Sequence, residues 1–277
     1  MGLAATYRRV GRPAKVRPSR YPLGVEIQYR SLLRGIVAEY RKVALLELER
    51  DGPLILARSL IFRLDEAPQA TGWAAMVKNL LLRVANGISY VLEAGLNRIG
   101  LIAQQVDGVS KTEFRKQVRA AYGIDILRGE PQLADLLSAW TEENAALIKS
   151  IPDRLTEQLR SEFTTAFTNG TSLRDLTKIV RDKTGLSDTR SMLIAGDQIG
   201  KLTGRLDRMR QESVGVQSYH WITSGDERVR PLHRARNGKE FRWDSPPSDG
   251  HPGQPIRCRC TASPIFPTEF GTNVTRL

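Results

Sequence analysis

The chain has 277 residues, of which 40% are hydrophobic and 26% charged, and its formal net charge is +12. This composition excludes a disordered chain, and the length predicts one large or two modest globular domains. The charge favours a polyanionic partner, either nucleic acid or an acidic protein surface. Two cysteines separated by one arginine exclude a secreted disulfide scaffold, and the lack of a long apolar run predicts no membrane partner.

The first 23 residues are basic and contain no acidic residue. Prolines and the absence of apolar periodicity predict a basic extended arm over 1–23. Such an arm could bind DNA phosphates or a groove of a partner, or it could be a solvated tail. Its cations are Arg8, Arg9, Arg12, Lys15, Arg17 and Arg20.

Apolar residues then recur at helical spacing and predict a helical body over 24–214. We expect helices over 25–50, 54–63, 71–102, 111–122, 131–149, 153–168, 173–183 and 188–213. Breaks are predicted at Gly52-Pro53, Pro152 and Gly185, and N-caps at Ser110 and Ser172. Because the predicted loops are short, neighbouring helices should be antiparallel.

The pattern changes at Gly215, after which residues 216–223 alternate as in a strand. Further short strands are predicted over 239–243 and 261–266, and Asn237-Gly238 predicts a two-residue hairpin turn. The fold class predicted for the whole chain is therefore mainly α, with a small C-terminal α+β lobe of short strands and irregular loops over 215–266. Residues 267–277 are predicted to form a polar tail.

All three histidines and both cysteines lie between residues 220 and 260. Four of these side chains could form a tetrahedral zinc site that holds the lobe together: Cys258, Cys260, His233 and His251. Arginines beside the cysteines would favour the thiolates that bind metal. Buried free cysteines with hydrogen-bonded histidines are an alternative, as are a disulfide or a catalytic metal. His220 is expected to be a packing or surface residue.

Other side chains of the lobe are assigned to its architecture. Asp226 and Arg230 are predicted to form a buried pair that fixes a loop, and Trp221 and Trp243 to lie in the core. A general-base pair of Asp226 and His233 is the catalytic alternative. Because no nucleophile, phosphate-binding loop or paired carboxylate accompanies it, we expect no enzyme and no small-molecule substrate.

The same stretch resembles the C-terminal signature of the Mu F-like head morphogenesis family, the minor capsid proteins of tailed phages. The order W-x-T-x-x-D-x-x-V-R-x-x-H, G-x-x-F, Pro-Pro, His-Pro and C-R-C carries the resemblance. The matching residues are Trp221, Thr223, Asp226, Val229, Arg230, His233, Gly238, Phe241, Pro246, Pro247, His251, Pro252, Cys258, Arg259, Cys260 and Pro264. Gly196 stands where family members more often carry arginine.

The resemblance implies a non-enzymatic minor head protein that joins the portal to the capsid interior and can touch packaged double-stranded DNA. Its partners would be the portal protein and a major capsid or scaffold protein. Its location would be the virion near the portal vertex, and the host cytoplasm during assembly. The alternative is a zinc-dependent nuclease or toxin delivered with the genome. Some family members carry an added toxin domain, but this chain ends soon after Cys260, so we expect none.

Overall fold

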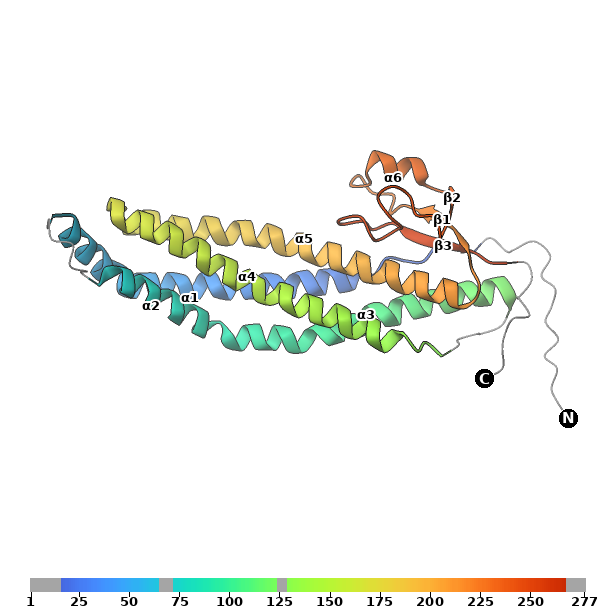
Figure 1. Cartoon of the computed structure of the whole chain (residues 1–277), viewed down its shortest axis with the longest axis horizontal. Helices are drawn as coiled ribbons and strands as arrows, with labels where there is room; N and C mark the ends of the chain where they lie inside the picture. The colour runs from blue at the N-terminus through green and yellow to red at the C-terminus, as the bar shows by residue number, and fades with distance from the viewer. Residues whose placement is uncertain (1–15, 65–71, 124–128, 268–277) are drawn as a thin grey trace. The chain divides into compact units, whose positions relative to one another are not determined.

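The computed structural model describes residues 16–64, 72–123 and 129–267 (Figure 1). Six helices and three strands lie in these ranges. They are α1 (Leu23–Leu64), α2 (Trp73–Gly87), α3 (Ser89–Tyr122), α4 (Leu133–Asn169), α5 (Leu173–Ser213), β1 (Ser218–Ile222), α6 (Pro231–Arg236), β2 (Glu240–Arg242) and β3 (Thr261–Ile265). The predicted fold class, mainly α with a small α+β part, is confirmed. Within the described ranges, no helix has the length and apolar character needed to span a bilayer.

Several predicted helix breaks are wrong. α1 continues through Gly52 and Pro53, α4 through Pro152, and α5 through Gly185. A proline inside a helix removes a backbone hydrogen bond and costs about 3 kcal/mol. Burial of the flanking apolar residues offsets this cost, since Leu48 and Ile55 on either side of Pro53 are at most 1% exposed. The tertiary core therefore overrides the local stop signal.

Ser110 is not an N-cap, because α3 runs through it and its hydroxyl bonds to another helix. Ser172 does cap α5: its Oγ accepts the backbone N–H of Asp175 at 3.2 Å and donates to the Asp175 carboxylate at 2.7 Å. Left-handed glycines follow the ends of three helices, close to the predicted ends at residues 122, 168 and 213: Gly123, Gly170 and Gly215, with φ of 71°, 73° and 82°. Cap residues and glycines thus mark helix ends correctly where the buried face of the helix does not continue past them.

The chain divides into two compact units, and α1, α3, α4 and α5 contribute to both. One unit, here unit 2, comprises residues 27–100 and 141–195. In it, Tyr29 donates to Asn144 and Tyr40 bonds to Thr156, each at 2.8 Å, so α1 and α4 run in the same direction. Lys183 of α5 pairs with Glu162 of α4 at 2.5 Å across a short connection, so these consecutive helices are antiparallel.

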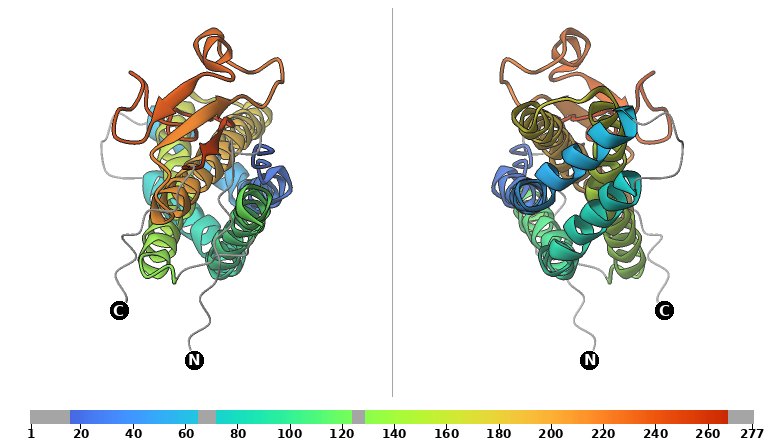
Figure 2. Two further views of the ribbon diagram at one scale, coloured as in Figure 1. Left: turned by 90° about the vertical axis from the view of Figure 1, so that its right-hand side faces the viewer. Right: turned by 90° about the vertical axis from the view of Figure 1, so that its left-hand side faces the viewer.

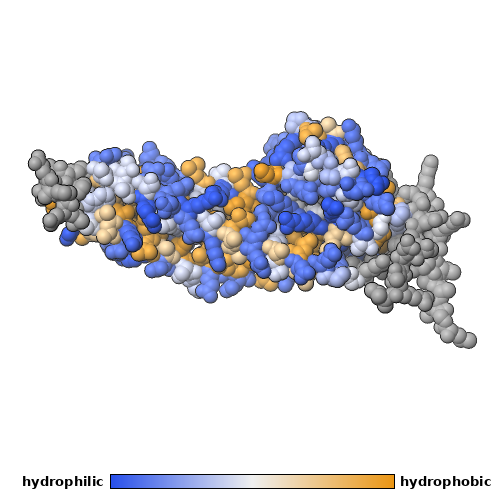
Figure 3. Space-filling view, viewed as in Figure 1, coloured by the Kyte–Doolittle hydropathy of each residue, from blue (hydrophilic) through white to orange (hydrophobic). Residues whose placement is uncertain are grey.

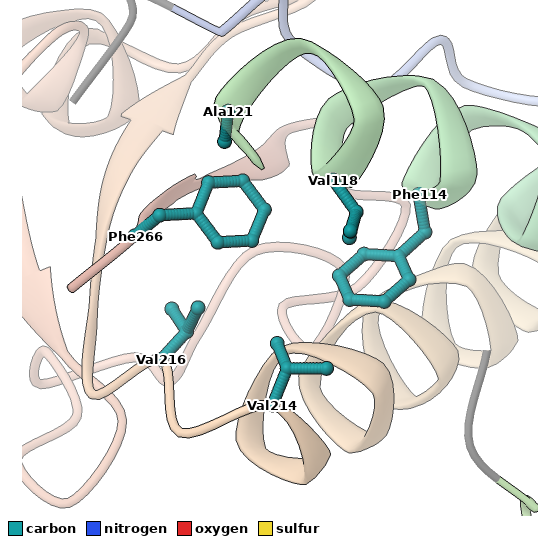
Figure 4. Close-up of a cluster of buried hydrophobic side chains, with 6 residues drawn as sticks. All are labelled: Phe114, Val118, Ala121, Val214, Val216 and Phe266. Carbon is teal, nitrogen blue, oxygen red and sulfur yellow. The ribbon is translucent and has the colours of Figure 1, made fainter. Parts of the chain in front are cut away.

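The other unit, here unit 1, includes the described residues of 16–26, 101–140 and 196–267. Its three-stranded sheet has the order β2-β1-β3, and β1 is antiparallel to both neighbours (Figure 2). A buried apolar cluster joins the end of α3 to the segments that follow α5 and β3 (Figure 4). Its members are Phe114, Val118, Ala121, Val214, Val216 and Phe266. This cluster anchors the lobe at both of its ends.

The predicted hairpin at Asn237-Gly238 is wrong, because these residues connect a helix to a strand. The preceding residues form α6, a six-residue helix with Pro231 in its first turn. Gly238 still adopts the left-handed conformation, with φ 76°, and its N–H donates to the Trp221 carbonyl at 2.7 Å. The sequence therefore predicts the left-handed turn at Gly238 but not the helix α6 that precedes it.

A buried polar network lies between α3 and α5 in unit 1. The hydroxyl of Ser110 donates to Asp207 Oδ1 at 2.9 Å, and the other oxygen of this carboxyl has no hydrogen-bond partner among the described residues. Burial raises the pKa of Asp207 to about 7. The folded carboxyl therefore holds its proton at pH values where the unfolded chain releases it.

We expect stability to fall as pH rises from about 4 to about 7, because the folded state binds the proton more tightly across that range. Asp207→Asn keeps the shape of the protonated carboxyl, so it should flatten this dependence and stabilise the protein at pH 8 by about 2–4 kcal/mol. Urea unfolding at several pH values measures the effect. Asp153→Asn, at an exposed position of α4, is the control. An unchanged pH slope in Asp207→Asn would contradict the assignment.

Candidate functional site

The core of the lobe is built on the central strand β1. Its inward residues, Tyr219 and Trp221, are fully buried, while His220 between them is exposed as expected for a surface residue. They pack with Trp243, Cys258, Cys260 and Ala262. The predicted core tryptophans are therefore both in place, and the two cysteines lie against them.

The loop that leads to the cysteines rests directly on the backbone of α5. A Cβ atom on Gly200 would lie 2.5 Å from the Cys258 carbonyl oxygen, and one on Gly204 would lie 2.4 Å from that of Pro252. Gly253, with φ 86°, faces the same helix in return. Glycines four residues apart on one helix thus set the position of the segment that carries the cysteines.

His233, Cys258 and Cys260 converge on one point. His233 Nδ1 lies 3.7 Å from Cys258 Sγ and 3.6 Å from Cys260 Sγ. All three side chains are buried, and their donor atoms lie within 4.8 Å of one another. These three residues, which we call the His-Cys cluster, have the geometry to hold a metal ion.

The other ring nitrogen of His233 is held by a carboxylate. Asp249 Oδ2 lies 2.9 Å from His233 Nε2, and Arg236 bonds to the second oxygen of the same carboxylate. Burial opposes the ionised form, but the hydrogen bonds from Arg236 and His233 lower the pKa of Asp249 overall. Because a carboxylate only accepts, the proton of His233 lies on Nε2 and its Nδ1 lone pair faces the sulfurs.

His251, the fourth predicted metal ligand, lies elsewhere in the lobe. Its Nδ1 bonds to the Tyr219 hydroxyl at 2.8 Å, and its ring contacts Trp243 with centroids 4.9 Å apart. Burial lowers the pKa of His251 and favours the neutral ring. The His-Pro element is therefore part of the aromatic core, and the predicted four-ligand set is corrected to three residues.

The pKa values of the two thiols are shifted in opposite directions. The hydrogen bond from Cys260 lowers the pKa of Cys258 to about 6, and the same bond together with burial raises the pKa of Cys260. These surroundings thus favour the thiolate at Cys258 and disfavour it at Cys260.

A pocket of about 270 Å³ opens beside the His-Cys cluster. Four arginines line it, and we call it the arginine pocket: Arg228, Arg230, Arg257 and Arg259. Gly196 of α5 also lines it. The pocket is therefore electropositive and suited to an anion.

The predicted buried pair of Asp226 and Arg230 is wrong. Asp226 pairs instead with Arg259 at 3.5 Å, and its side chain is 38% exposed. Arg259 also binds the buried carboxylate of Glu26 at 2.9 Å, while Arg230 donates to the Ile256 carbonyl. The central arginine of the C-R-C motif, not the arginine of the V-R-x-x-H motif, is the cation that fixes the loop.

Part of the predicted basic arm can be placed. Residues 16–22 belong to no helix or strand, and hydrogen bonds fix them in unit 1. Gln117 of α3 donates to the Arg17 carbonyl and to Ser19 Oγ, both at 3.0 Å, and Thr261 donates to the Ser19 carbonyl. Arg20 follows in the same segment, whereas Arg8, Arg9, Arg12, Lys15 and the tail beyond 267 lie outside the described residues.

Sequence reasoning missed the residues that support the cluster. Asp249 lies in a Ser/Pro/Gly-rich loop, where an aspartate ordinarily indicates only a turn. Glu26 belongs to a helix more than 200 residues before its partner Arg259. The spacing of Gly196, Gly200 and Gly204 is the signal in the sequence for a close contact between this helix and the lobe. A glycine at every fourth position leaves one face of a helix without side chains.

These features define a mainly helical protein whose small C-terminal sheet, built around a histidine and two cysteines, is seated on the helix before it. The family model described as Phage Mu protein F like protein matches residues 157–263 of this chain. The match runs from the second half of α4 through α5 and into β3. It confirms the resemblance seen in the sequence.

An uncharacterized protein of Haemophilus influenzae is 34% identical to this chain over 164 residues. The alignment covers 58% of this chain and 37% of the relative, so the chain spans well under two thirds of the relative's length. No solved structure matches the chain significantly.

Proposed function

We propose that this protein is a minor head protein of a tailed phage that acts as a non-enzymatic adaptor between the portal and the capsid interior. The match over residues 157–263 carries the proposal, because the family is one of structural phage head proteins. The proposed partners are the portal protein and a major capsid or scaffold protein. The proposed location is the virion, near the portal vertex.

An exposed apolar face on α1 supports a protein partner for the helices. Leu46, Leu54 and Ile61 are 56%, 53% and 54% exposed, and their spacing of eight and seven residues places them on one side of the helix. Figure 3 shows apolar residues, in orange, among the polar residues on one face of the molecule. Such side chains lose contact with water when a partner covers them.

The arginine pocket favours binding over turnover. Asp226 is the carboxylate that lines it, and this group is already paired with Arg259. The Nδ1 atom of His233 faces the sulfurs of Cys258 and Cys260, and the residue is 2% exposed, so its free ring nitrogen is directed at the cysteines and not at a substrate in the pocket. General acid–base hydrolysis needs one group that accepts a proton and another that donates one. Because neither Asp226 nor His233 is free to do so, the pocket supports the adaptor over a nuclease or toxin.

Contact with packaged DNA is a second part of the proposal. Arg228, Arg234 and Arg257 are exposed on the lobe and have no carboxylate partner in the described part of the chain. Together with the net charge of +12, they would attract phosphates in a salt-dependent way.

Sedimentation of the purified protein with purified portal rings tests the proposal. After nuclease treatment, we expect the protein to sediment with the rings. Leu54→Asp should weaken this association at least tenfold, since it places a charge in the covered apolar face. Leu232→Asp is the matched control, because Leu232 is similarly exposed, at 51%, but lies on α6.

Failure to sediment with the rings, or absence of the protein from purified virions, would contradict the adaptor role. A nuclease activity that Asp226→Ala abolishes would favour the enzyme. Added duplex DNA should bind at low salt and be released at high salt, and salt-insensitive binding would contradict phosphate contact.

A further inference from the structure

The distances within the His-Cys cluster match those of a coordinated metal. A tetrahedral zinc ion with Zn–S bonds of about 2.3 Å and a Zn–N bond of about 2.0 Å holds its nitrogen and sulfur ligands about 3.5–3.6 Å apart. The observed Nδ1–Sγ distances are 3.7 Å and 3.6 Å. Two sides of the triangle of donor atoms therefore match a coordination tetrahedron, and the two sulfurs lie within 4.8 Å of each other.

Hydrogen bonding explains this arrangement less well. With its proton on Nε2, the His233 ring offers a single lone pair at Nδ1, and two thiols converge on it. Only one S–H group can use that lone pair in good geometry, and the other is left with the weaker bond between the two sulfurs. A cation at the centre satisfies all three donors at once.

The surroundings of the cluster are those of a metal site. Metal-binding histidines commonly donate their other N–H to a carboxylate, which fixes the ring and makes it a better ligand. Asp249 occupies this place for His233, and Arg236 fixes Asp249 in turn. The Trp221 ring packs edge-on against His233, with centroids 5.0 Å apart. The ring of His233 is thus held on both sides.

We propose that His233, Cys258 and Cys260 bind one zinc ion, whose fourth coordination position opens into the arginine pocket. Two thiolates and one imidazole select zinc among the common divalent ions. Among the described residues, no further histidine, cysteine or carboxylate lies close enough to these three side chains to act as a fourth ligand. The fourth ligand is therefore a water molecule or a small anion, which the arginines would stabilise.

The proposed ion joins α6 to the segment that rests on Gly200 of α5. It would thereby stabilise a lobe that has only a small apolar core, because the free energy of metal binding adds to that of folding. The inference does not depend on the portal-binding role, since a zinc site in the lobe is compatible with any partner.

Elemental analysis of the full chain purified under reducing conditions tests the proposal. We expect one zinc per chain, and cobalt substitution should give the thiolate-to-metal absorption of a tetrahedral site. His233→Ala and Cys258→Ser should lose the metal. Asp249→Asn, which keeps every ligand, should weaken zinc binding by about 10- to 100-fold.

Two histidine variants are the controls. His220→Ala, at an exposed position of β1, and His251→Gln, in the aromatic core, should both retain one zinc per chain. If the ligand variants fail to fold, the wild-type chain still decides the question: removal of zinc with a chelator should lower its melting temperature, and added zinc should restore it. A wild-type chain that neither carries nor takes up zinc, or that forms a Cys258–Cys260 disulfide under reducing conditions, would overturn the proposal.

Discussion

Gly200→Ala is expected to destabilise the protein by about 3 kcal/mol or more, because its new methyl group would meet the carbonyl oxygen of Cys258 at 2.5 Å. The obstacle is backbone, which cannot rotate away as a side chain would. Relief requires the loop to lift from α5, and this would move Cys258 away from His233. We therefore expect a lower melting temperature together with weakened zinc binding, measured by thermal unfolding and competitive metal titration.

Gly185→Ala is the matched control on the same helix. No atom lies within 4 Å of its added Cβ, so the variant should be neutral or more stable by up to about 1 kcal/mol, given the helix propensity of alanine. Gly196→Ala should also be tolerated, since the nearest atom is a Glu26 oxygen at an ordinary 3.6 Å. Equal stabilities for the Gly200 and Gly185 variants would show that the loop does not touch the helix as described.

Arg210→Ala should cost about 3–5 kcal/mol, because it leaves two largely buried carboxylates without their cation. The Arg210 side chain is 1% exposed, and its Nε lies 2.6 Å from Glu130 Oε1. The same guanidinium binds Asp107 of α3. Urea unfolding measures the loss, and Arg210→Lys should recover only part of it, since an amine cannot reproduce the fork of the guanidinium.

Arg160→Ala is the control for the loss of an arginine from a helix. Arg160 and its partner Glu157 are 53% and 71% exposed, and exposed pairs contribute at most about 1 kcal/mol. Adding Asp107→Asn to the Arg210→Ala background should restore part of the stability, because one of the stranded charges is removed. If the Arg210 and Arg160 variants lose equal stability, the buried network does not stabilise unit 1.

The proposed zinc site and the proposed adaptor role involve different parts of the chain. The long helices offer apolar and charged surface to a partner, whereas the lobe gains its rigidity from a few fixed points. These points are the His-Cys cluster, the close approach at Gly200 and Gly204, and the Arg259–Glu26 pair. Such fixed points would stabilise a lobe that has only a small apolar core.

The amino-acid sequence by itself determined the mainly α class, the change to strands after Gly215, the left-handed helix ends and the gathering of histidine and cysteine in one lobe. Each depends on residue identity or on a repeat within a few residues, and such signals act locally. Packing decided where the helices continue, since burial of Leu48 and Ile55 outweighs the stop at Pro53. It also decided that His251 joins the aromatic core while Asp249 supports His233, and that Glu26 meets Arg259. Contacts between residues far apart in the chain depend on the whole set of packed surfaces, so no local pattern could predict them.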